Sequence, residues 1–138
     1  MFDNVDTSAM DLSVPYEPAA IFNSEADTVE YVRDDELTIS RRVDRHLTLF
    51  VRMEDRSEVI GFRLKGFRNL YISRMKPIRI LFEKNDDFVL VADAIEEAIR
   101  EHFEDAEFTN DEIFAAYKKA AEIAVQGGAR VETQFLAA

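Results

Sequence analysis

A change of hydrophobic periodicity partway along the chain restricts most strongly what this sequence can fold into. From about residue 19 to residue 65, apolar and polar residues alternate with a period of two, which is typical of half-buried β-strands. In the C-terminal third the period becomes about 3.6, which is typical of amphipathic α-helices. Because every such element has one apolar side, strands and helices must cover one another, and the sequence predicts an α+β fold.

The region of period two predicts a four- to five-stranded antiparallel meander with short connections. The polar clusters SEAD, VDRH and EDRSE separate the strands and contain residue types that favour turns. In the two central strands, the residues expected to face the core are Leu47, Leu49, Val51, Met53, Ile60, Phe62 and Leu64. Those expected on the opposite, polar face are Thr48, Phe50, Arg52, Val59, Gly61, Arg63 and Lys65.

Two C-terminal amphipathic helices are predicted to pack on one face of this sheet. The first covers at least residues 93–103. We favour a start at Asp86, and the alternative is that FVLVA (88–92) forms a strand paired with IRILF (78–82). The second begins at the capping box Thr109-Asn110-Asp111-Glu112 and ends at Gly127-Gly128. RVETQFL, which follows these glycines, is expected to form a last edge strand.

Length and composition limit the class of protein. The 138 residues fit a single domain, residues 18–138, after an acidic arm of residues 1–17 that we expect to be flexible or draped on the surface. The absence of cysteine excludes disulfides, thiol nucleophiles and cysteine-ligated metals. No apolar run approaches the roughly 20 residues of a membrane helix, and the N-terminus is acidic where a targeting peptide is basic. These features predict a cytoplasmic protein with no membrane contact.

Charge is divided unevenly along the chain. Residues 1–40 have a net charge of −9, residues 41–82 of +7 and residues 83–138 of −9, which gives −11 for the whole chain. Within the basic middle, the stretch GFRLKGFRNLYISRMKPIRILF (61–82) contains six cations and no carboxylate. Such asymmetry concerns association with partners rather than the fold itself.

The candidate binding residues come from this basic middle. Arg42, Phe50, Arg52, Arg63 and Lys65 are expected on the polar face of the sheet, and Arg68, Arg74, Lys76 and Arg79 would extend the patch. Guanidinium groups can hold phosphates while a ring stacks on a base, so the patch has the chemistry of a nucleic-acid or polyanion site. The alternative, which we favour, is that acids of the flanking thirds pair with these cations. The pI of 4.6 also argues against nucleic acid.

Motifs for catalysis are missing from the sequence. Gly61 and Gly66 have the first spacing of a P-loop, but Phe67-Arg68 stands where Lys-Ser/Thr is required. His46 is expected in a solvated turn, and His102 near a helix C-terminus, where an imidazolium is favoured. One helix face carries four carboxylates that could hold a hard cation such as Mg²⁺ but more often are solvated: Glu97, Glu101, Glu104 and Asp105. We expect no catalytic residue, cofactor or metal.

Residues 21–66 resemble a family of short bacterial domains of unknown function. Its members open with a Tyr-Asp-x-x-Ala-Asp-x-Leu-Tyr-Ile segment and close with an Asp-x-x-Gly-x-x-Val-Gly-x-Glu hairpin. The matching residues are Phe22, Asn23, Ala26, Asp27, Val29 and Tyr31 in FNSEADTVEYV, and Asp55, Val59, Ile60 and Gly61 in MEDRSEVIGF. The chain departs from the pattern at Arg56-Ser57, where the turn glycine would stand, and at Arg63, where the acid would stand. The resemblance implies a small curled sheet and brings no established activity.

Taken together, these features favour a small non-catalytic interaction or regulatory protein, which binds a protein partner or self-associates as a homo-oligomer. The edge-forming last strand is the reason to expect self-association. The alternatives are nucleic-acid or polyanion binding through the basic sheet face, and a metal-dependent enzyme that uses the acidic helix face.

Overall fold

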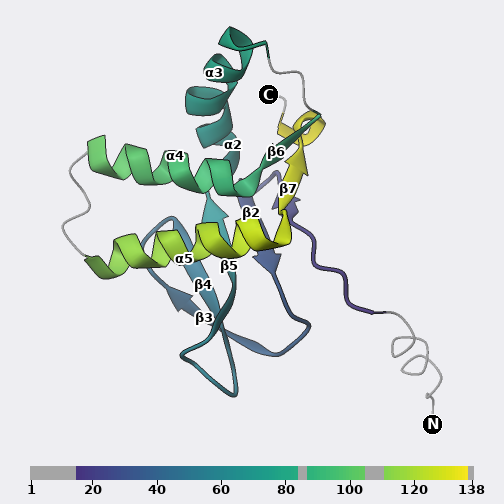
Figure 1. Ribbon diagram of the computed structural model, residues 1–138, viewed down its shortest axis with the longest axis vertical. Helices are drawn as coiled ribbons and strands as arrows, with labels where there is room; N and C mark the ends of the chain where they lie inside the picture. The colour runs from purple at the N-terminus through teal and green to yellow at the C-terminus, as the bar shows by residue number, and fades with distance from the viewer. Residues whose placement is uncertain (1–14, 84–86, 105–110, 137–138) are drawn as a thin grey trace.

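The main sheet forms the centre of the computed structural model, which describes residues 15–83, 87–104 and 111–136. Its strands are β1 (Ile21–Asn23), β2 (Thr28–Val32), β3 (Thr38–Arg42), β4 (Leu47–Arg52) and β5 (Val59–Lys65). Within these residues they form one five-stranded antiparallel sheet with the order β1-β2-β5-β4-β3 (Figure 1). The α+β class and the antiparallel sheet are confirmed. The strand order differs from a simple meander, because β2 pairs with β5 rather than with β3.

The pairing of β2 with β5 depends on close packing on both sides of the strands. Val29 lies opposite Leu64 and Tyr31 opposite Phe62, and all four side chains are buried. On β5, a Cβ atom at Gly61 would lie 2.5 Å from the carbonyl oxygen of Tyr31, closer than real Cβ contacts allow. A glycine is therefore required where β2 comes against the central strand.

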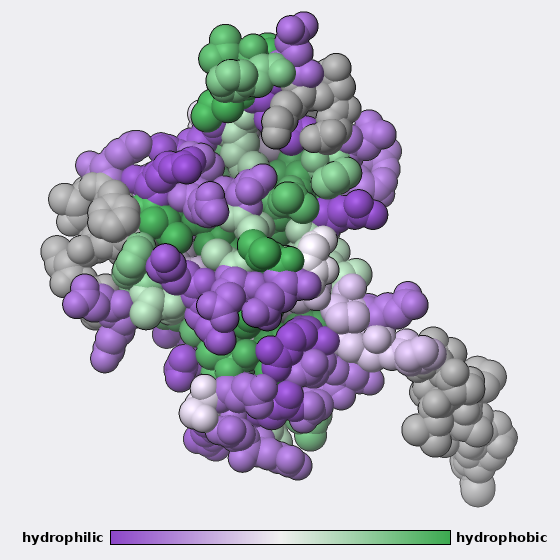
Figure 2. Space-filling view, viewed as in Figure 1, coloured by the Kyte–Doolittle hydropathy of each residue, from purple (hydrophilic) through white to green (hydrophobic). Residues whose placement is uncertain are grey.

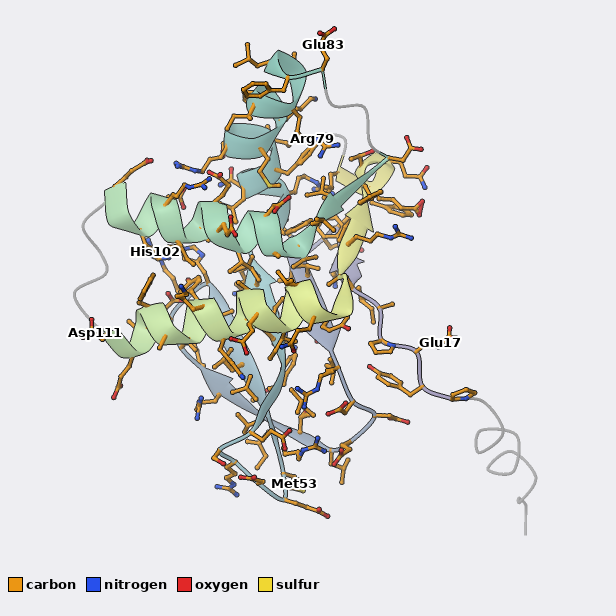
Figure 3. The ribbon with its side chains drawn as sticks, in the orientation of Figure 1. Glu17, Met53, Arg79, Glu83, His102 and Asp111 are labelled. Carbon is orange, nitrogen blue, oxygen red and sulfur yellow. The ribbon has the colours of Figure 1, made fainter. Side chains whose placement is uncertain are left out.

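A β-bulge between β4 and β5 changes which residues face the core. The register shifts after Phe50, so that Val51 pairs with Val59, and Val59 joins the core rather than the polar face predicted for it. The prediction for Met53 is also wrong. Met53 follows the last residue of β4, in the hairpin connection at the bottom of Figure 3, and its exposed fraction is 49%.

A helical segment leads from β5 away from the sheet. It consists of α2 (Phe67–Leu70), the π-helical turn η1 (Tyr71–Met75) and α3 (Lys76–Leu81). Asp27, in the turn between β1 and β2, fixes the start of this segment. Its carboxylate accepts hydrogen bonds from the backbone amides of Arg68 at 2.6 Å and of Asn69 at 3.3 Å. The distant turn thus supplies the cap that α2 needs.

The two C-terminal helices cover the apolar face of the sheet. They are α4 (Val91–Glu104) and α5 (Asp111–Gly127), and they lie side by side across the strands (Figure 1). The residues that they bury include Ala94, Ile95, Ala98, Tyr117, Ala120, Ile123 and Ala124. This part of the prediction is confirmed, and so is the end of α5 at the glycine pair, where Gly128 has a φ of +61°. The capping box starts at residues 109 and 110, which lie outside the described residues.

A second, smaller sheet corrects the prediction for residues 86–92. Phe88–Leu90 form strand β6, which pairs with β7 (Arg130–Glu132) through Val89 opposite Val131. The favoured helix start at Asp86 is therefore wrong, because Val89 is buried between two more exposed neighbours, as in a strand. The alternative partner, IRILF, is also wrong because its first four residues lie in α3. The last strand is already paired, and the 3₁₀ helix η2 (Thr133–Leu136) follows it.

Residues 1–14 of the predicted acidic arm lie outside the described residues. At residue 16 the chain runs beside the main sheet, since the Tyr16 hydroxyl donates a hydrogen bond of 2.7 Å to the carbonyl oxygen of Val32 on β2. In the described part of the chain, no helix combines the length and the apolar character needed to cross a membrane.

Leu49 and Met53 provide a matched test of this burial pattern, because both were expected to face the core. We expect Leu49→Ala to lower the free energy of unfolding by about 2–5 kcal/mol, since a fully packed side chain is removed. Met53→Ala should cost less than about 0.5 kcal/mol. Urea denaturation of both variants measures the difference, and equal losses would contradict the register of β4.

Candidate functional site

The five candidate residues of the basic sheet face come from three neighbouring strands. Thr48 on β4 pairs with Arg42 on β3 and with Arg63 on β5, so the two arginines flank one position of β4. Phe50 and Arg52 follow on β4, and Lys65 ends β5. The structure therefore brings these residues onto one region of the sheet, and their contacts decide what that region can bind.

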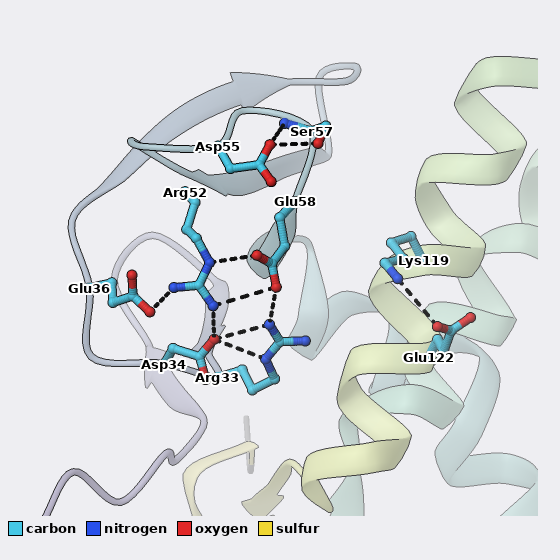
Figure 4. Close-up of polar contacts among 9 residues, drawn as sticks. All are labelled: Arg33, Asp34, Glu36, Arg52, Asp55, Ser57, Glu58, Lys119 and Glu122. Atoms are coloured by element: carbon cyan, nitrogen blue, oxygen red, sulfur yellow. Dashed lines mark hydrogen bonds and ion pairs between the residues drawn. The ribbon is translucent and has the colours of Figure 1, made fainter.

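Arg52 is part of an ion-pair cluster at one end of the sheet, which consists of Arg33, Asp34, Glu36, Arg52 and Glu58 (Figure 4). Its Nη2 lies 2.8 Å from Asp34 Oδ2, its Nε lies 2.6 Å from Glu58 Oε1, and its Nη1 contacts Glu36. Arg33 bridges the same Asp34 and Glu58 at 3.0 and 2.9 Å. Three carboxylates surround two guanidinium groups, so this end of the face carries no excess positive charge.

The cluster changes the acidity of its members. The hydrogen bond from Arg33 is the main reason that the pKa of Asp34 lies below its usual value. The hydrogen bond from Arg52 has the same effect on the pKa of Glu58, and Glu58 in turn raises the pKa of Arg52. Each side chain stabilises the charged form of its partner, which is the behaviour of a structural ion-pair network.

Phe50 and Arg63 do not offer the stacking platform that the sequence suggested. Phe50 is only 5% exposed, and the guanidinium carbon of Arg63 lies 5.4 Å from its ring centroid. Arg63 Nε also lies 3.3 Å from Glu30 Oε2 on β2. The ring is already covered by a cation that has its own carboxylate, so the expectation that Phe50 is exposed is wrong.

Arg42 and Lys65 remain as exposed cations of this face. Arg42 Nε donates to the backbone carbonyl of Asp44 at 3.1 Å. Within the described residues, neither side chain forms an ion pair with a carboxylate. Arg42 also lines a groove of about 710 Å³ between the edge of the sheet and α5, together with Arg41, Val43, Ile113 and Lys119.

The acidic face of α4 is occupied by a cation of the basic middle. Arg74, on η1, donates from Nε to Glu97 at 3.1 Å and from Nη1 and Nη2 to Glu104 at 3.1 and 2.9 Å. Arg100 also contacts Glu97, which is buried. In the described part of the chain, no group of three or more His, Asp or Glu side chains is placed to hold a metal ion. Asp105 lies outside that part.

A buried polar cluster that the sequence analysis missed joins the β3–β4 turn to both long helices. The Tyr117 hydroxyl donates to Asp44 Oδ2 at 2.8 Å and lies 3.1 Å from His102 Nε2. His46 and His102 have ring centroids 6.0 Å apart. His102 is 8% exposed and points from α4 toward α5 (Figure 3), and His46 is half-buried rather than a solvated turn residue.

The position of this cluster points to a structural role. Asp44 Oδ1 also accepts from the backbone amides of His46 and Leu47, both at 2.8 Å, so it organises the turn itself. The cavity beside the two histidines measures about 40 Å³. This space suits a water molecule rather than a substrate. Asp44 and Tyr117 are 73 residues apart, so no local sequence signal could have revealed the contact.

The most unusual surface of the molecule lies on α3 and its flanks. Five large apolar side chains there are exposed, and we call them the α3 surface: Ile72, Ile78, Ile80, Leu81 and Phe82. Exposed fractions reach 66% for Ile80, 74% for Leu81 and 69% for Phe82. Figure 2 shows these hydrophobic side chains gathered at the top of the molecule, where α3 projects beyond α4.

Comparisons of the chain with models of protein families, with curated proteins and with solved structures find no match. The resemblance of residues 21–66 to a family of short domains therefore stays a prediction.

The ion-pair cluster predicts how stability changes with pH. Arg52→Gln should let the pKa values of Asp34 and Glu58 return toward their usual range. Because a lowered carboxyl pKa stabilises the fold above its unfolded value of about 4, the wild type should exceed the variant in melting temperature at neutral pH. This difference should shrink as the pH falls below about 4. Arg56→Gln is the control, since Arg56 is exposed and forms no ion pair within the described residues. A difference that does not change with pH would contradict the network.

The buried polar cluster predicts that Tyr117→Phe lowers the free energy of unfolding by about 1–3 kcal/mol, because half-buried Asp44 loses its hydroxyl donor. Tyr16→Phe removes an exposed hydroxyl and should cost about 1 kcal/mol or less. Thermal denaturation of both variants compares them, and a loss at Tyr16 as large as that at Tyr117 would count against the structural role.

Proposed function

We propose that this protein is a non-catalytic interaction module that binds a protein partner through the α3 surface. The observation that carries the proposal is the exposure of α3 itself. Five of its six residues are exposed and the sixth, Arg79, is half-buried. Soluble proteins rarely leave several large apolar side chains together in water, and such patches mark sites of contact with other molecules.

The attachment of α3 supports a role in binding rather than an accident of packing. The segment just before it is firmly anchored, since Phe67, Leu70, Tyr71 and Met75 are buried. The chain then continues as helix for a further turn and a half, with Pro77 in the first turn, where proline is favoured. A rigid base therefore presents the apolar side chains in one fixed arrangement, which lowers the entropic cost of binding.

Polyanion binding through the basic sheet face is the weaker proposal. It would need Arg52 and Arg63 to exchange close carboxylates for phosphates, and Phe50 to lose the cation over its ring. The observation that still favours polyanion binding is the exposure of Arg42 and Lys65. Titration with labelled single- and double-stranded oligonucleotides at low salt decides it, and binding that falls steeply with salt would revive it.

A capture experiment tests the role of the α3 surface. The immobilised protein is mixed with an extract of its native cells, and the retained proteins are identified by mass spectrometry. We expect an identified partner that the wild type retains and that Ile80→Asp loses at least about tenfold, because a carboxylate would be desolvated at the contact.

The matched control is Val125→Asp, which puts the same charge on an apolar side chain of α5 that is 67% exposed. This variant should retain the partner as well as the wild type does. Retention of the same proteins by Ile80→Asp would contradict the proposal, provided that both variants melt at the wild-type temperature.

A further inference from the structure

We infer that the partner of the α3 surface is a second copy of this chain, in a twofold dimer. The inference rests on the proposed function and names the occupant of its surface. It follows from the chemistry of the two sides of α3 and of the facing part of α4, which complement one another. The inference does not depend on the edge-forming last strand that was first given as a reason for self-association. In the part of the chain that the structure describes, β7 pairs with β6 along one side only.

One side of α3 is an apolar ridge with a cation. Helical spacing places Lys76 and Ile80 on the same side, four residues apart, and Leu81 follows about 100° further round the helix. All three are exposed, and within the described residues Lys76 has no ion pair. This ridge offers two aliphatic side chains and one uncompensated positive charge.

The other side of α3 forms an apolar groove with acids. Met75, Ile78 and Phe82 face α4 across a groove of about 190 Å³. On the α4 wall of this groove stand Asp93 and Glu96, which are exposed and form no ion pair within the described part of the chain. Arg79 and Arg100 also line the groove, and Arg100 contacts Glu97. With Asp93, Glu96 and Glu97 against these two cations, the groove keeps an excess of negative charge beside its apolar floor, the counterpart of the ridge.

Ridge and groove lie on opposite sides of one short helix, which suits a closed pair. When two α3 helices lie next to each other about a twofold axis, each ridge can enter the groove of the other copy. Leu81 and Ile80 then meet Ile78 and Phe82, and Lys76 meets Glu96, twice in each dimer. An isologous interface requires this self-complementarity. The meeting of Lys76 with Glu96 fixes the register of the two helices.

Two charge reversals test the inference, because they separate a second copy from any other partner. Lys76→Glu alone places Glu against Glu96 at both contacts, and Glu96→Lys alone places Lys76 against Lys at both. Each variant should dimerise at least about tenfold more weakly than the wild type. In a mixture of the two variants, both contacts of the mixed dimer are again Lys against Glu, so dimers should re-form. Sedimentation velocity from about 1 to about 100 µM, in about 0.15 M salt, measures this. Asp93 is left unchanged because it lies in the first turn of α4, where an acid stabilises the helix.

Each outcome decides between clear alternatives. A wild type that stays monomeric over this range overturns the inference, and so does a dimer that neither variant weakens or that the mixture does not restore. Particles larger than dimers would overturn the closed twofold arrangement. If the protein is monomeric and an identified partner still depends on Ile80 in the capture experiment, the dimer fails and the proposed function stands. If there is neither a dimer nor a partner that depends on Ile80, the dimer and the proposed function both fail.

Discussion

The antiparallel pairing of β2 with β5 is the constraint on which the rest of the structure depends. Backbone pairing, the glycine at position 61 and the cap from Asp27 all act there. Together they fix the first hairpin to the end of the central strand and set the direction in which α2 leaves it. Since α3 continues from α2 and η1, the apolar side chains of α3 inherit their position from this join. The surface that we assign to binding is therefore set by the sheet, far from the side chains that do the binding.

The distribution of charge on the folded molecule is set by ion pairs between distant residues and not by the order of charges along the sequence. The basic middle of the sequence is taken apart in the fold. Arg52 pairs with acids around the β2–β3 and β4–β5 connections, Arg63 with Glu30, and Arg74 with α4. The acid-free stretch of residues 61–82 does not form one basic surface, since its cations pair with acids on different elements, as Arg63 does with β2 and Arg74 with α4. Among the residues that the structure describes, a small number of exposed cations lie without a carboxylate partner, and one of them, Lys76, lies beside exposed apolar groups.

The sequence was sufficient to locate strands and helices that have one strongly apolar and one strongly polar face. The alternation around Leu49 and Phe62 and the stripe on α5 located the sheet, its turns and the helices that cover it, because burial of one face decides the conformation. The predictions from sequence failed where a contact between distant segments determines the conformation or the burial of a residue. The bulge that turns Val59 inward, the pairing of Val89 with Val131 and the contact between Asp44 and Tyr117 each depend on a segment far away in the chain. The candidate residues on the sheet face were brought together as expected, but whether Arg52 and Phe50 were available depended on neighbours that periodicity does not specify.

The edges of the main sheet give the exposed helix a further meaning. One edge is β1, which has three residues, and the other is β3, which ends in the adjacent Arg41 and Arg42. Short edges and edges that carry repeated positive charge are poor templates for additional strands. The α3 surface instead gathers exposed apolar side chains on a helix, where contact is limited by shape and stops once the partner is in place. Attachment through a free strand edge has no such limit and can continue into a fibre.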